Sequence, residues 1–426
     1  MCQYRILGGN RLMGELEIGG AKNAVLPILA AACLNDREMK IHNCPRIADV
    51  FATISILENL GFSVRFEKNT LEISRVGVLQ SEIPEEFAKK MRSSILFMGA
   101  LLAKTGRVQL ALPGGCKLGE RAINLHIAGL EAMGATIIER NGILHCETSK
   151  KGLHGAKIRL AFPSVGATEN LLIAATMAKG ETFIENAAKE PEIADLAAFL
   201  KKMGAEIRGA GTGNIYVKGN SKFDKEITHT TIPDRIVVGT YLLAAAMTGG
   251  EITLAGVRPF DLSSFTSYLS EMGCKIRAER DCVTLCAPSQ LLSFPRIVTK
   301  VHPGFPTDMQ AQFVAAMTIA HKRCELTETI FEGRCSHVSE LRKMGASIHL
   351  TANKRTFTID GVKKLRGATV TAHDLRCGAA MVLAGLAAEG ETVVQNAHHV
   401  ERGYEDIERD LTLLGGEIKL KTPKSP

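Results

Sequence analysis

One phrase recurs six times along the chain, and its spacing constrains the fold more than any other feature of the sequence. The phrase ends a segment with helical periodicity, places a glycine and continues into a strand-like segment, as in "LEAMGATI" and "LKKMGAEI". The glycines are Gly61, Gly134, Gly204, Gly273, Gly345 and Gly415. Neighbouring glycines lie 69 to 73 residues apart, so six such units fill the 426 residues and the repeat is the architecture. A glycine at this point predicts a helix cap with positive φ.

A second recurring element is a helix rich in Ala, Leu and Met that is apolar nearly all round. A helix without a polar face must be buried. These helices are predicted at residues 24–34, 93–103, 167–178, 235–247, 309–320 and 377–388. Strand-like segments such as "GETFIEN" follow them directly. Each repeat therefore contains two helices and several strands, and one helix is enclosed by the rest.

Six buried helices are too many for one hydrophobic core, so we expect two lobes with three repeats each. The boundary falls near "THTTIPDR", which interrupts the periodic pattern. The strand "YRILGGNRLMGELEI" precedes the first buried helix, and we expect it to pair in the other lobe. The predicted first lobe is residues 21–230, and the second is residues 1–20 plus 231–426. The chain then crosses between lobes near Gly20 and near Thr231.

Composition excludes several classes of protein. Hydrophobic residues make up 45% of the chain and charged residues 23%, as in globular proteins. The N-terminus lacks the apolar core of a signal peptide, and no stretch is long and apolar enough to span a bilayer, so we expect a cytoplasmic protein without membrane contact. A net charge of +7 without basic blocks argues against nucleic-acid binding. The 11 cysteines form no CxxC pairs and HExxH is missing, so we expect no metal, cofactor or disulfide.

The sequence turns polar just before each buried helix, where unpaired N–H groups and the helix dipole favour an anion. The polar residues there are Lys22, Asn23, Arg92, Ser164, Asp234, Arg235, Asp308, Asp374 and Arg376. The simpler interpretation is that the Ser, Asp and Asn side chains only cap their helices. The arginines favour the alternative, a binding site for an anion, because the helix dipole disfavours a cation at a helix start unless an anion compensates its charge. With Arg121, Arg334 and Arg402 they suit a phosphorylated substrate.

The loop "LPGGCKLGER" carries Cys116 between two glycines and two cations. Glycines allow close approach to a ligand, and Lys117 and Arg121 would lower the pKa of the thiol and raise its reactivity. The alternative is a purely structural cysteine, but the other cysteines with that role lie mostly in apolar runs. His126 has apolar neighbours at helical spacing, which is typical of a hydrogen-bonded core histidine.

Long motifs identify a resemblance that runs from end to end. They include "GAKNAVLPIL", "MRSSI", "LPGGCKLGER", "SVGATEN", "PDRI", "HPGFPTDMQAQF", "HDLR" and "ERGYE". With them the chain resembles the UDP-N-acetylglucosamine enolpyruvyl transferases of the enolpyruvyl transferase family. The resemblance implies a two-lobed inside-out α/β barrel of six βαβαββ repeats with buried helices, three per lobe. It places the active site in the cleft between the lobes.

The implied reaction moves the enolpyruvyl group of phosphoenolpyruvate to the 3-hydroxyl of UDP-N-acetylglucosamine and releases phosphate. It runs by addition and elimination through a tetrahedral ketal, without metal, as the first committed step of peptidoglycan synthesis. By resemblance, the catalytic residues are Cys116, Asp308, Lys22 and Arg402. Cys116 is the implied proton donor and the thiol that fosfomycin alkylates, while Asp308 is a general base or proton relay.

The resemblance also implies two binding sets. Phosphoenolpyruvate is assigned to Lys22, Asn23, Arg121, Arg334, Arg376 and Arg402. UDP-N-acetylglucosamine is assigned to Arg92, Arg121, Ala122, Ile123, Asn124, Leu125, Ser164, Val165, Gly166, Asp308 and Ile330. The chain departs from many members at Asn124, where they carry Asp, and at Gly333, Cys335 and Ser336. Asn can still donate to and accept from a uracil edge.

Two rival functions are weighed against this one. The shikimate-pathway enolpyruvyl transferase shares the architecture, but its members carry "GDKS" where this chain has "GAKN" and they lack the PGGC loop. A non-catalytic paralogue that only senses a nucleotide would be favoured by loss of Lys22, Cys116, Asp308 or Arg402, and all four are present.

Overall fold

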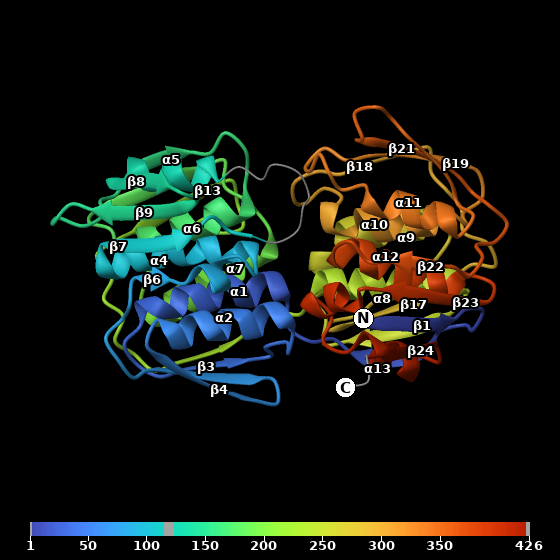
Figure 1. Cartoon of the computed structure of the whole chain (residues 1–426), viewed down its shortest axis with the longest axis horizontal. Coiled ribbons are helices and arrows are strands. Elements are labelled where there is room, and N and C mark those ends of the chain that lie inside the picture. Colours follow the sequence, from blue (N-terminus) through green and yellow to red (C-terminus); the bar gives the residue numbers. More distant parts are fainter. Residues whose placement is uncertain (1, 115–122, 423–426) are drawn as a thin grey trace. The chain divides into compact units, whose positions relative to one another are not determined.

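The computed structural model describes residues 2–114 and 123–422, which divide into two compact lobes (Figure 1). The first lobe contains residues 20–114 and 123–232, and the second contains residues 2–19 and 233–422. The chain passes from the second lobe to the first after Gly19 and returns after Ile232. These crossings lie beside Gly20 and Thr231, near which the sequence predicts them. Each lobe has its own core of buried aliphatic and aromatic side chains.

The first lobe contains three four-stranded sheets, ordered β14-β3-β5-β4, β6-β7-β9-β8 and β10-β11-β13-β12. Its strands are β3 (Met39–His42), β4 (Phe62–Glu67), β5 (Thr70–Arg75), β6 (Glu82–Ile83), β7 (Arg107–Ala111), β8 (Ala135–Arg140), β9 (Ile143–Thr148), β10 (Lys157–Arg159), β11 (Glu181–Glu185), β12 (Glu206–Arg208), β13 (Asn214–Lys218) and β14 (Ile227–Thr230). Its helices are α1 (Lys22–Ala31), η1 (Ala32–Leu34), α2 (Ala48–Asn59), α3 (Glu85–Ala88), η2 (Arg92–Ile95), α4 (Leu96–Thr105), α5 (Asn124–Ala132), α6 (Val165–Ala175) and α7 (Pro191–Met203).

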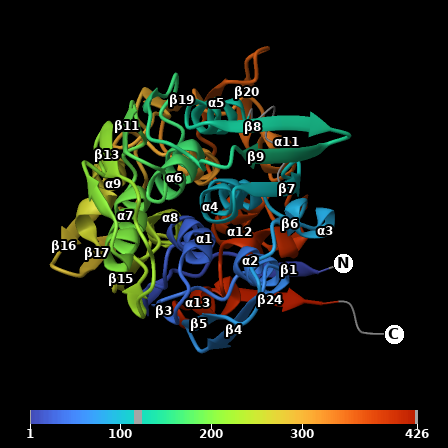
Figure 2. The same cartoon turned by 90° about the vertical axis from the view of Figure 1, so that its left-hand side faces the viewer.

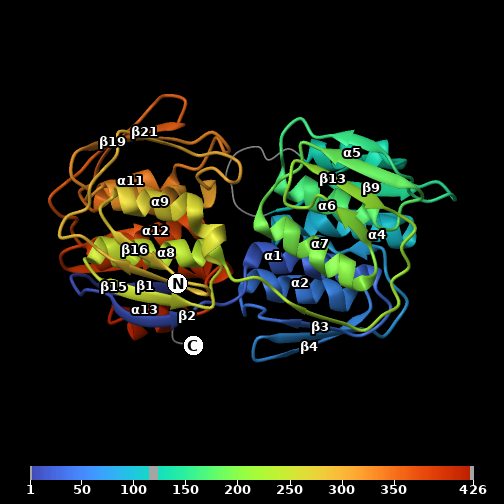
Figure 3. The same cartoon turned by 180° about the vertical axis from the view of Figure 1, so that it is seen from behind.

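The second lobe, seen from behind in Figure 3, repeats this plan. Its sheets are ordered β22-β23-β1-β24, β16-β17-β15-β2 and β18-β19-β21-β20. Its strands are β1 (Gln3–Leu7), β2 (Met13–Glu17), β15 (Glu251–Ala255), β16 (Lys275–Ala278), β17 (Cys282–Cys286), β18 (Arg296–Val298), β19 (Arg323–Thr327), β20 (Ser347–Leu350), β21 (Thr356–Asp360), β22 (Thr369–Thr371), β23 (Glu391–Gln395) and β24 (Glu417–Lys421). Its helices are α8 (Arg235–Thr248), η3 (Pro259–Leu262), α9 (Ser263–Glu271), η4 (Thr307–Met309), α10 (Gln310–Met317), α11 (Ser336–Lys343), α12 (Leu375–Ala387), η5 (Ala397–Arg402) and α13 (Ile407–Leu413).

All six sheets have one topology, a parallel pair followed by two antiparallel pairs. In the third repeat, for example, β10 pairs parallel with β11, while β13 pairs antiparallel with β11 and β12. Its chain order β10-α6-β11-α7-β12-β13 is a βαβαββ unit. The predicted architecture of six βαβαββ repeats with buried helices is therefore confirmed.

Two repeats exchange their first strands, which is why the chain crosses twice. Strand β2 precedes α1 of the first lobe but pairs with β15 of the second. Strand β14 precedes α8 of the second lobe but pairs with β3 of the first. Strand β1 completes the last repeat by pairing with both β23 and β24. The N-terminal segment thus belongs to the second lobe.

The Ala-rich helices α1, α4, α6, α8, α10 and α12 are almost wholly buried, as predicted from their composition. Figure 2 shows α1, α4 and α6 inside the first lobe with the sheets around them. The six repeat glycines all have positive φ, between +90° and +118°. They let each amphipathic helix end and turn directly into its strand. Among the described residues, no helix is long and apolar enough to cross a membrane.

The buried helices approach closely at Gly99 of α4. Its backbone N–H donates to Asn170 Oδ1 of α6 at 2.7 Å. A Cβ at position 99 would lie 2.3 Å from Asn170 Oδ1 and 2.4 Å from the Asn170 backbone oxygen. The backbone oxygen is part of a buried helix, so it has little room to move. Only glycine therefore fits at this contact.

We predict that Gly99→Ala destabilises the first lobe by roughly 1–3 kcal/mol, because overpacking forces the two helices apart. Thermal unfolding followed by circular dichroism measures this. Gly77→Ala is the matched control, since its Cβ would meet nothing closer than 3.9 Å and its φ is not positive. Equal melting temperatures for the two variants would show that α4 and α6 are not packed in this way.

Candidate active site

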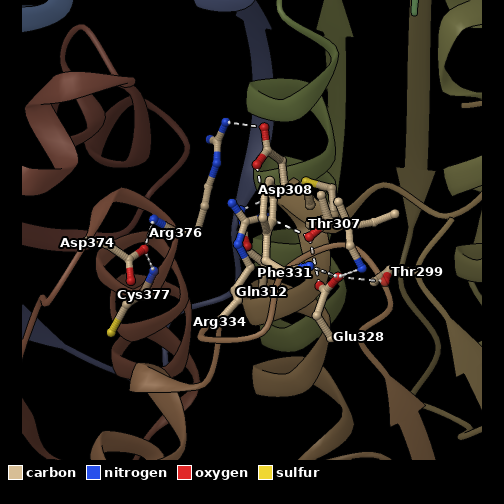
Figure 4. Close-up of polar contacts among 12 residues, drawn as sticks. Thr299, Thr307, Asp308, Gln312, Glu328, Phe331, Arg334, Asp374, Arg376 and Cys377 are labelled. Atoms are coloured by element: carbon tan, nitrogen blue, oxygen red, sulfur yellow. Dashed lines mark hydrogen bonds and ion pairs between the residues drawn. The ribbon is translucent and has the colours of Figure 1, made fainter. Parts of the chain in front are cut away.

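Asp308 of the second lobe lies between two arginines (Figure 4). Arg334 Nη1 donates to Asp308 Oδ1 and Arg376 Nη2 donates to Asp308 Oδ2, each at 3.0 Å. The Arg334 and Arg376 side chains are only 5% and 9% exposed, whereas that of Asp308 is 26% exposed. One carboxylate against two guanidinium groups leaves this trio with a positive charge. Two buried arginines thus fix the carboxylate, which remains partly accessible from solvent.

The electrostatics of this trio keep Asp308 ionised. Burial alone would raise the pKa of its carboxyl, but the charges of Arg376 and Arg334 and their hydrogen bonds hold that pKa well below its usual range. Burial alone would lower the pKa of Arg376, and the charge of Asp308 instead raises it. An Asp308 carboxylate in this state is a weak base. Its basicity increases if the hydrogen bonds and charge interactions with the two arginines weaken.

Arg376 is positioned by the start of helix α12. Asp374 caps this helix, because its Oδ1 accepts from the backbone N–H groups of Arg376 at 2.9 Å and Cys377 at 3.0 Å. The Ser336 hydroxyl donates to Asp374 Oδ2 at 2.9 Å. The sequence predicts that an anion compensates the charge of Arg376 at this helix start. In the structure this anion is the carboxylate of Asp308, a residue of the same chain.

The first lobe contains a matching pair. Lys22 is the first residue of α1, and its Nζ lies 2.7 Å from Asp49 Oδ2 in the first turn of α2. The two side chains are 13% and 7% exposed. As at Arg376, a cation at a helix start is compensated by a carboxylate from another element. Lys22 is therefore fixed in place beside the N-termini of two helices.

Asn170 organises a second group of first-lobe residues. Because its Oδ1 accepts from Gly99, its amide nitrogen is the group that faces the Ile95 carbonyl at 3.1 Å and His126 Nδ1 at 3.0 Å. His126 Nδ1 is thus the acceptor and Nε2 carries the proton. A Cβ at Gly166 would lie 3.4 Å from Nε2, so the imidazole faces the start of α6. The prediction of a hydrogen-bonded core histidine is confirmed.

Ser164 caps α6 by accepting from the Ala167 backbone N–H at 3.3 Å, so the simpler interpretation of Ser164 as a cap holds. Arg92 begins η2 and is half-buried. Burial, with a smaller contribution from the charge of Arg92, lowers the pKa of His126 to about 4. Of the residues assigned to the nucleotide sugar, Gly166 thus faces the His126 ring, and Arg92 acts on that ring through its charge.

The remaining predicted residues have simple positions. Asn23 is the second residue of α1, Ile123 directly precedes α5, and Asn124 and Leu125 begin it. Ile330 follows β19, and Arg402 ends η5. Val165 and Gly166 are the first two residues of α6. Cys116, Arg121 and Ala122 lie outside the described residues.

Within residues 2–114 and 123–422, no group of three or more His, Cys, Asp or Glu side chains could hold a metal ion.

Sequence reasoning missed the residues that support the site. Asn170 and Thr307 stand in the quoted motifs without a role, Ser336 is only a departure from other members, and Asp49 and Glu328 belong to no quoted motif. All five are polar residues that the fold buries or half-buries, and no local pattern pairs any of them with its partner. The residue types gave a weak signal, since a buried polar side chain needs a hydrogen-bonding partner.

The two-lobed fold occurs in solved enolpyruvyl transferases. The chain superposes on the enolpyruvyl transferase NikO from Streptomyces tendae with a TM-score of 0.89 over 99% of both chains, at 23% identity. It superposes on EPSP synthase from Acinetobacter baumannii with a TM-score of 0.76, at 18% identity, over 99% of this chain and 100% of that one. These likenesses show that the chain has the two-lobed fold of these solved enolpyruvyl transferases.

Sequence comparison gives the family. Residues 6–411 match the family described as EPSP synthase (3-phosphoshikimate 1-carboxyvinyltransferase). The chain is 48% identical to UDP-N-acetylglucosamine 1-carboxyvinyltransferase 1 of Symbiobacterium thermophilum, over 98% of this chain and 94% of the relative. It is 46% identical to UDP-N-acetylglucosamine 1-carboxyvinyltransferase 2 of Caldanaerobacter subterraneus subsp. tengcongensis, over 98% and 99%. The chain belongs to the EPSP synthase family of enolpyruvyl transferases.

The buried histidines predict how stability depends on pH. Burial lowers the pKa of both His126 and His337 to about 4. Between this value and about 6.5, the unfolded chain binds more protons than the folded chain, so stability is lost as the pH falls. Each histidine should lower the free energy of unfolding by about 2 kcal/mol between pH 7 and pH 5.

Urea unfolding of the wild type and His126→Gln at pH 7, 6 and 5 tests this prediction for one histidine. Glutamine keeps an acceptor for Asn170 but does not titrate. The free energy of unfolding of the variant should fall by about 2 kcal/mol less than that of the wild type over this range. Parallel pH dependences would show that His126 is not held neutral.

Proposed function

We propose that this chain transfers the enolpyruvyl group of phosphoenolpyruvate to the 3-hydroxyl of UDP-N-acetylglucosamine and releases phosphate, the first committed step of peptidoglycan synthesis. The observation that carries the proposal is the match at 44–48% identity, over nearly the whole chain, to five relatives with this activity in their names. The arginines around Asp308 and the cation at Lys22 suit its anionic substrates.

Asp308 links substrate binding to proton transfer in this proposal. The phosphate and carboxylate of phosphoenolpyruvate compete with Asp308 for Arg334 and Arg376. A carboxylate that shares its cations becomes a stronger base, because the charges that lowered its pKa are partly neutralised. Asp308 then accepts the proton of the sugar 3-hydroxyl, or relays it, as that oxygen attacks C2 of phosphoenolpyruvate. Binding of phosphoenolpyruvate therefore also makes Asp308 basic enough to activate the sugar hydroxyl.

The other half of the addition needs a proton on the methylene carbon. We assign this proton to the thiol of Cys116, which is also our proposed target of alkylation by fosfomycin. Lys22, Asn23, Arg121 and Arg402 complete the phosphoenolpyruvate set. In the elimination, C2 expels phosphate while the methyl group returns a proton, so the enolpyruvyl double bond is regenerated. Cations around the phosphate stabilise it as it leaves.

We assign the nucleotide sugar to the start of α6, to η2, and to residues 121–125, with Ile330 and Asp308 at the sugar. Ser164 caps α6, and Val165 and Gly166 are its first two residues, where backbone N–H groups have no partner within the helix and suit a diphosphate. Arg92 begins η2, and its contribution to the low pKa of His126 supports a cation near the same place. The neutral His126 adds no further charge there.

Phosphate release tests the function directly. Purified protein with phosphoenolpyruvate and UDP-N-acetylglucosamine should release one phosphate per carboxyvinyl product, with no added metal. With shikimate 3-phosphate as acceptor, phosphate should stay at background. Cys116→Ser should lower kcat by about 10²–10⁴-fold, because a hydroxyl is a poor acid. Cys282→Ser, a half-buried cysteine on β17, is the control and should retain wild-type kcat.

Two results would contradict the proposal. Turnover with shikimate 3-phosphate in place of the nucleotide sugar would assign the chain to the other acceptor. Phosphoenolpyruvate and nucleotide-sugar binding without turnover would favour a sensor instead. Wild-type activity of Cys116→Ser would leave the transfer reaction in place but remove Cys116 as the proton donor.

A further inference from the structure

Glu328 follows strand β19 and is almost fully buried, with 1% of its surface exposed. Four groups donate hydrogen bonds to its carboxylate. Oε1 accepts from Thr299 Oγ1 at 2.8 Å and from the backbone N–H groups of Ile330 at 2.7 Å and Phe331 at 3.2 Å. Oε2 accepts from Thr307 Oγ1 at 2.7 Å. A buried carboxylate with this many donors fixes the segments that supply them.

One of these segments runs from Glu328 to Arg334. Its residues Ile330 and Phe331 are tied to Glu328 through their backbone nitrogens. The guanidinium carbon of Arg334 lies 4.7 Å from the centre of the Phe331 ring, within the range of a cation–π contact. Glu328 therefore sets the position of the predicted sugar contact Ile330 and supports Arg334 from one side.

Thr307 provides a second route to Arg334 (Figure 4). Its hydroxyl has one proton, which is donated to Glu328, so its lone pairs accept from Arg334 Nη1 at 2.9 Å. The same Nη1 donates to Asp308, the next residue along the chain. The direction of this chain of hydrogen bonds is set by Glu328, because an ionised carboxylate only accepts.

We propose that Glu328 is a positioning residue for the reaction, acting through Thr307 on Arg334 and through the 330–331 backbone on the sugar contact. The inference rests on the proposed function, which assigns roles to Ile330, Arg334 and Asp308 but none to Glu328 or Thr307. The two routes predict separate kinetic effects. Loss of the Thr307 hydroxyl weakens the arrangement of Arg334 and Asp308, whereas loss of the Glu328 charge also releases the sugar-contacting segment.

Steady-state kinetics with both substrates separates these effects. Thr307→Val should lower kcat/KM for phosphoenolpyruvate by about 10- to 100-fold, and Thr307→Ser, which restores the hydroxyl, should stay near wild type. Glu328→Gln should in addition raise the KM for UDP-N-acetylglucosamine. Thr318→Val is the matched control, because the hydroxyl of this buried threonine at the end of α10 donates to a carbonyl of its own helix, Ala315 O, at 2.6 Å. The control should keep wild-type kinetics.

A double-mutant cycle tests whether Glu328 acts through Thr307. Adding Thr307→Val to Glu328→Gln should change kcat/KM for phosphoenolpyruvate little further, since both substitutions break the same route. Fully additive losses, or a Thr307→Val variant as active as Thr318→Val, would overturn the proposal. If valine prevents folding, as judged by thermal unfolding, Thr307→Ala replaces it. A loss in the alanine variant that serine does not share supports the proposal, and equal activities refute it.

The same assay separates this inference from the proposed function. Wild-type protein that releases no phosphate from the two substrates refutes the function, and the positioning role falls with it. An active wild type whose Thr307 and Glu328 variants behave like the control refutes the positioning role alone.

Discussion

The ionised state of Asp308 and the positions of Arg334 and Arg376 all depend on the double ion pair that joins these three residues. Removing two guanidinium groups and a carboxylate from water is costly, and the cost is repaid only where geometry is good and each group has partners. Here each oxygen of Asp308 accepts from one arginine, and Asp374 caps the helix that presents Arg376. The trio carries one excess positive charge and its carboxylate is partly exposed, which is what the proposed competition by an anion requires.

The repeat architecture explains why such pairs stand where they do. Each buried helix is covered on its sides by sheets and apolar side chains, so polar chemistry is confined to its ends. At both α1 and α12 a cation lies in the first two residues, where the helix dipole opposes it, and a carboxylate from another element compensates. Asp49 serves Lys22 and Asp308 serves Arg376. The same solution appears in both lobes with different residues.

The sequence predicted the repeating elements well because they are encoded locally. Gly61 and Gly134 signal their caps, and the Ala-rich runs signal burial, without knowledge of any partner. It did not predict the contacts that build the site, because these join distant positions: Asp308 and Arg376 are 68 residues apart and Ser336 and Asp374 are 38 apart. A list of polar residues at helix starts gives the types of side chain but neither the distances nor the pairing. Glu328 does not lie at the start of a helix, so the pattern of polar residues at helix starts does not include it.

Two arginines keep Asp308 ionised until, in the proposed reaction, an anion competes for them. Carbon-13 NMR of labelled aspartate, with the signal assigned by Asp308→Asn, measures its titration directly. Asp308 should stay ionised through the range of about pH 3 to 5 in which unpaired aspartates titrate, and Arg376→Gln should move its midpoint upward. An ordinary midpoint near 3.9 in the wild type, unchanged by Arg376→Gln, would contradict it.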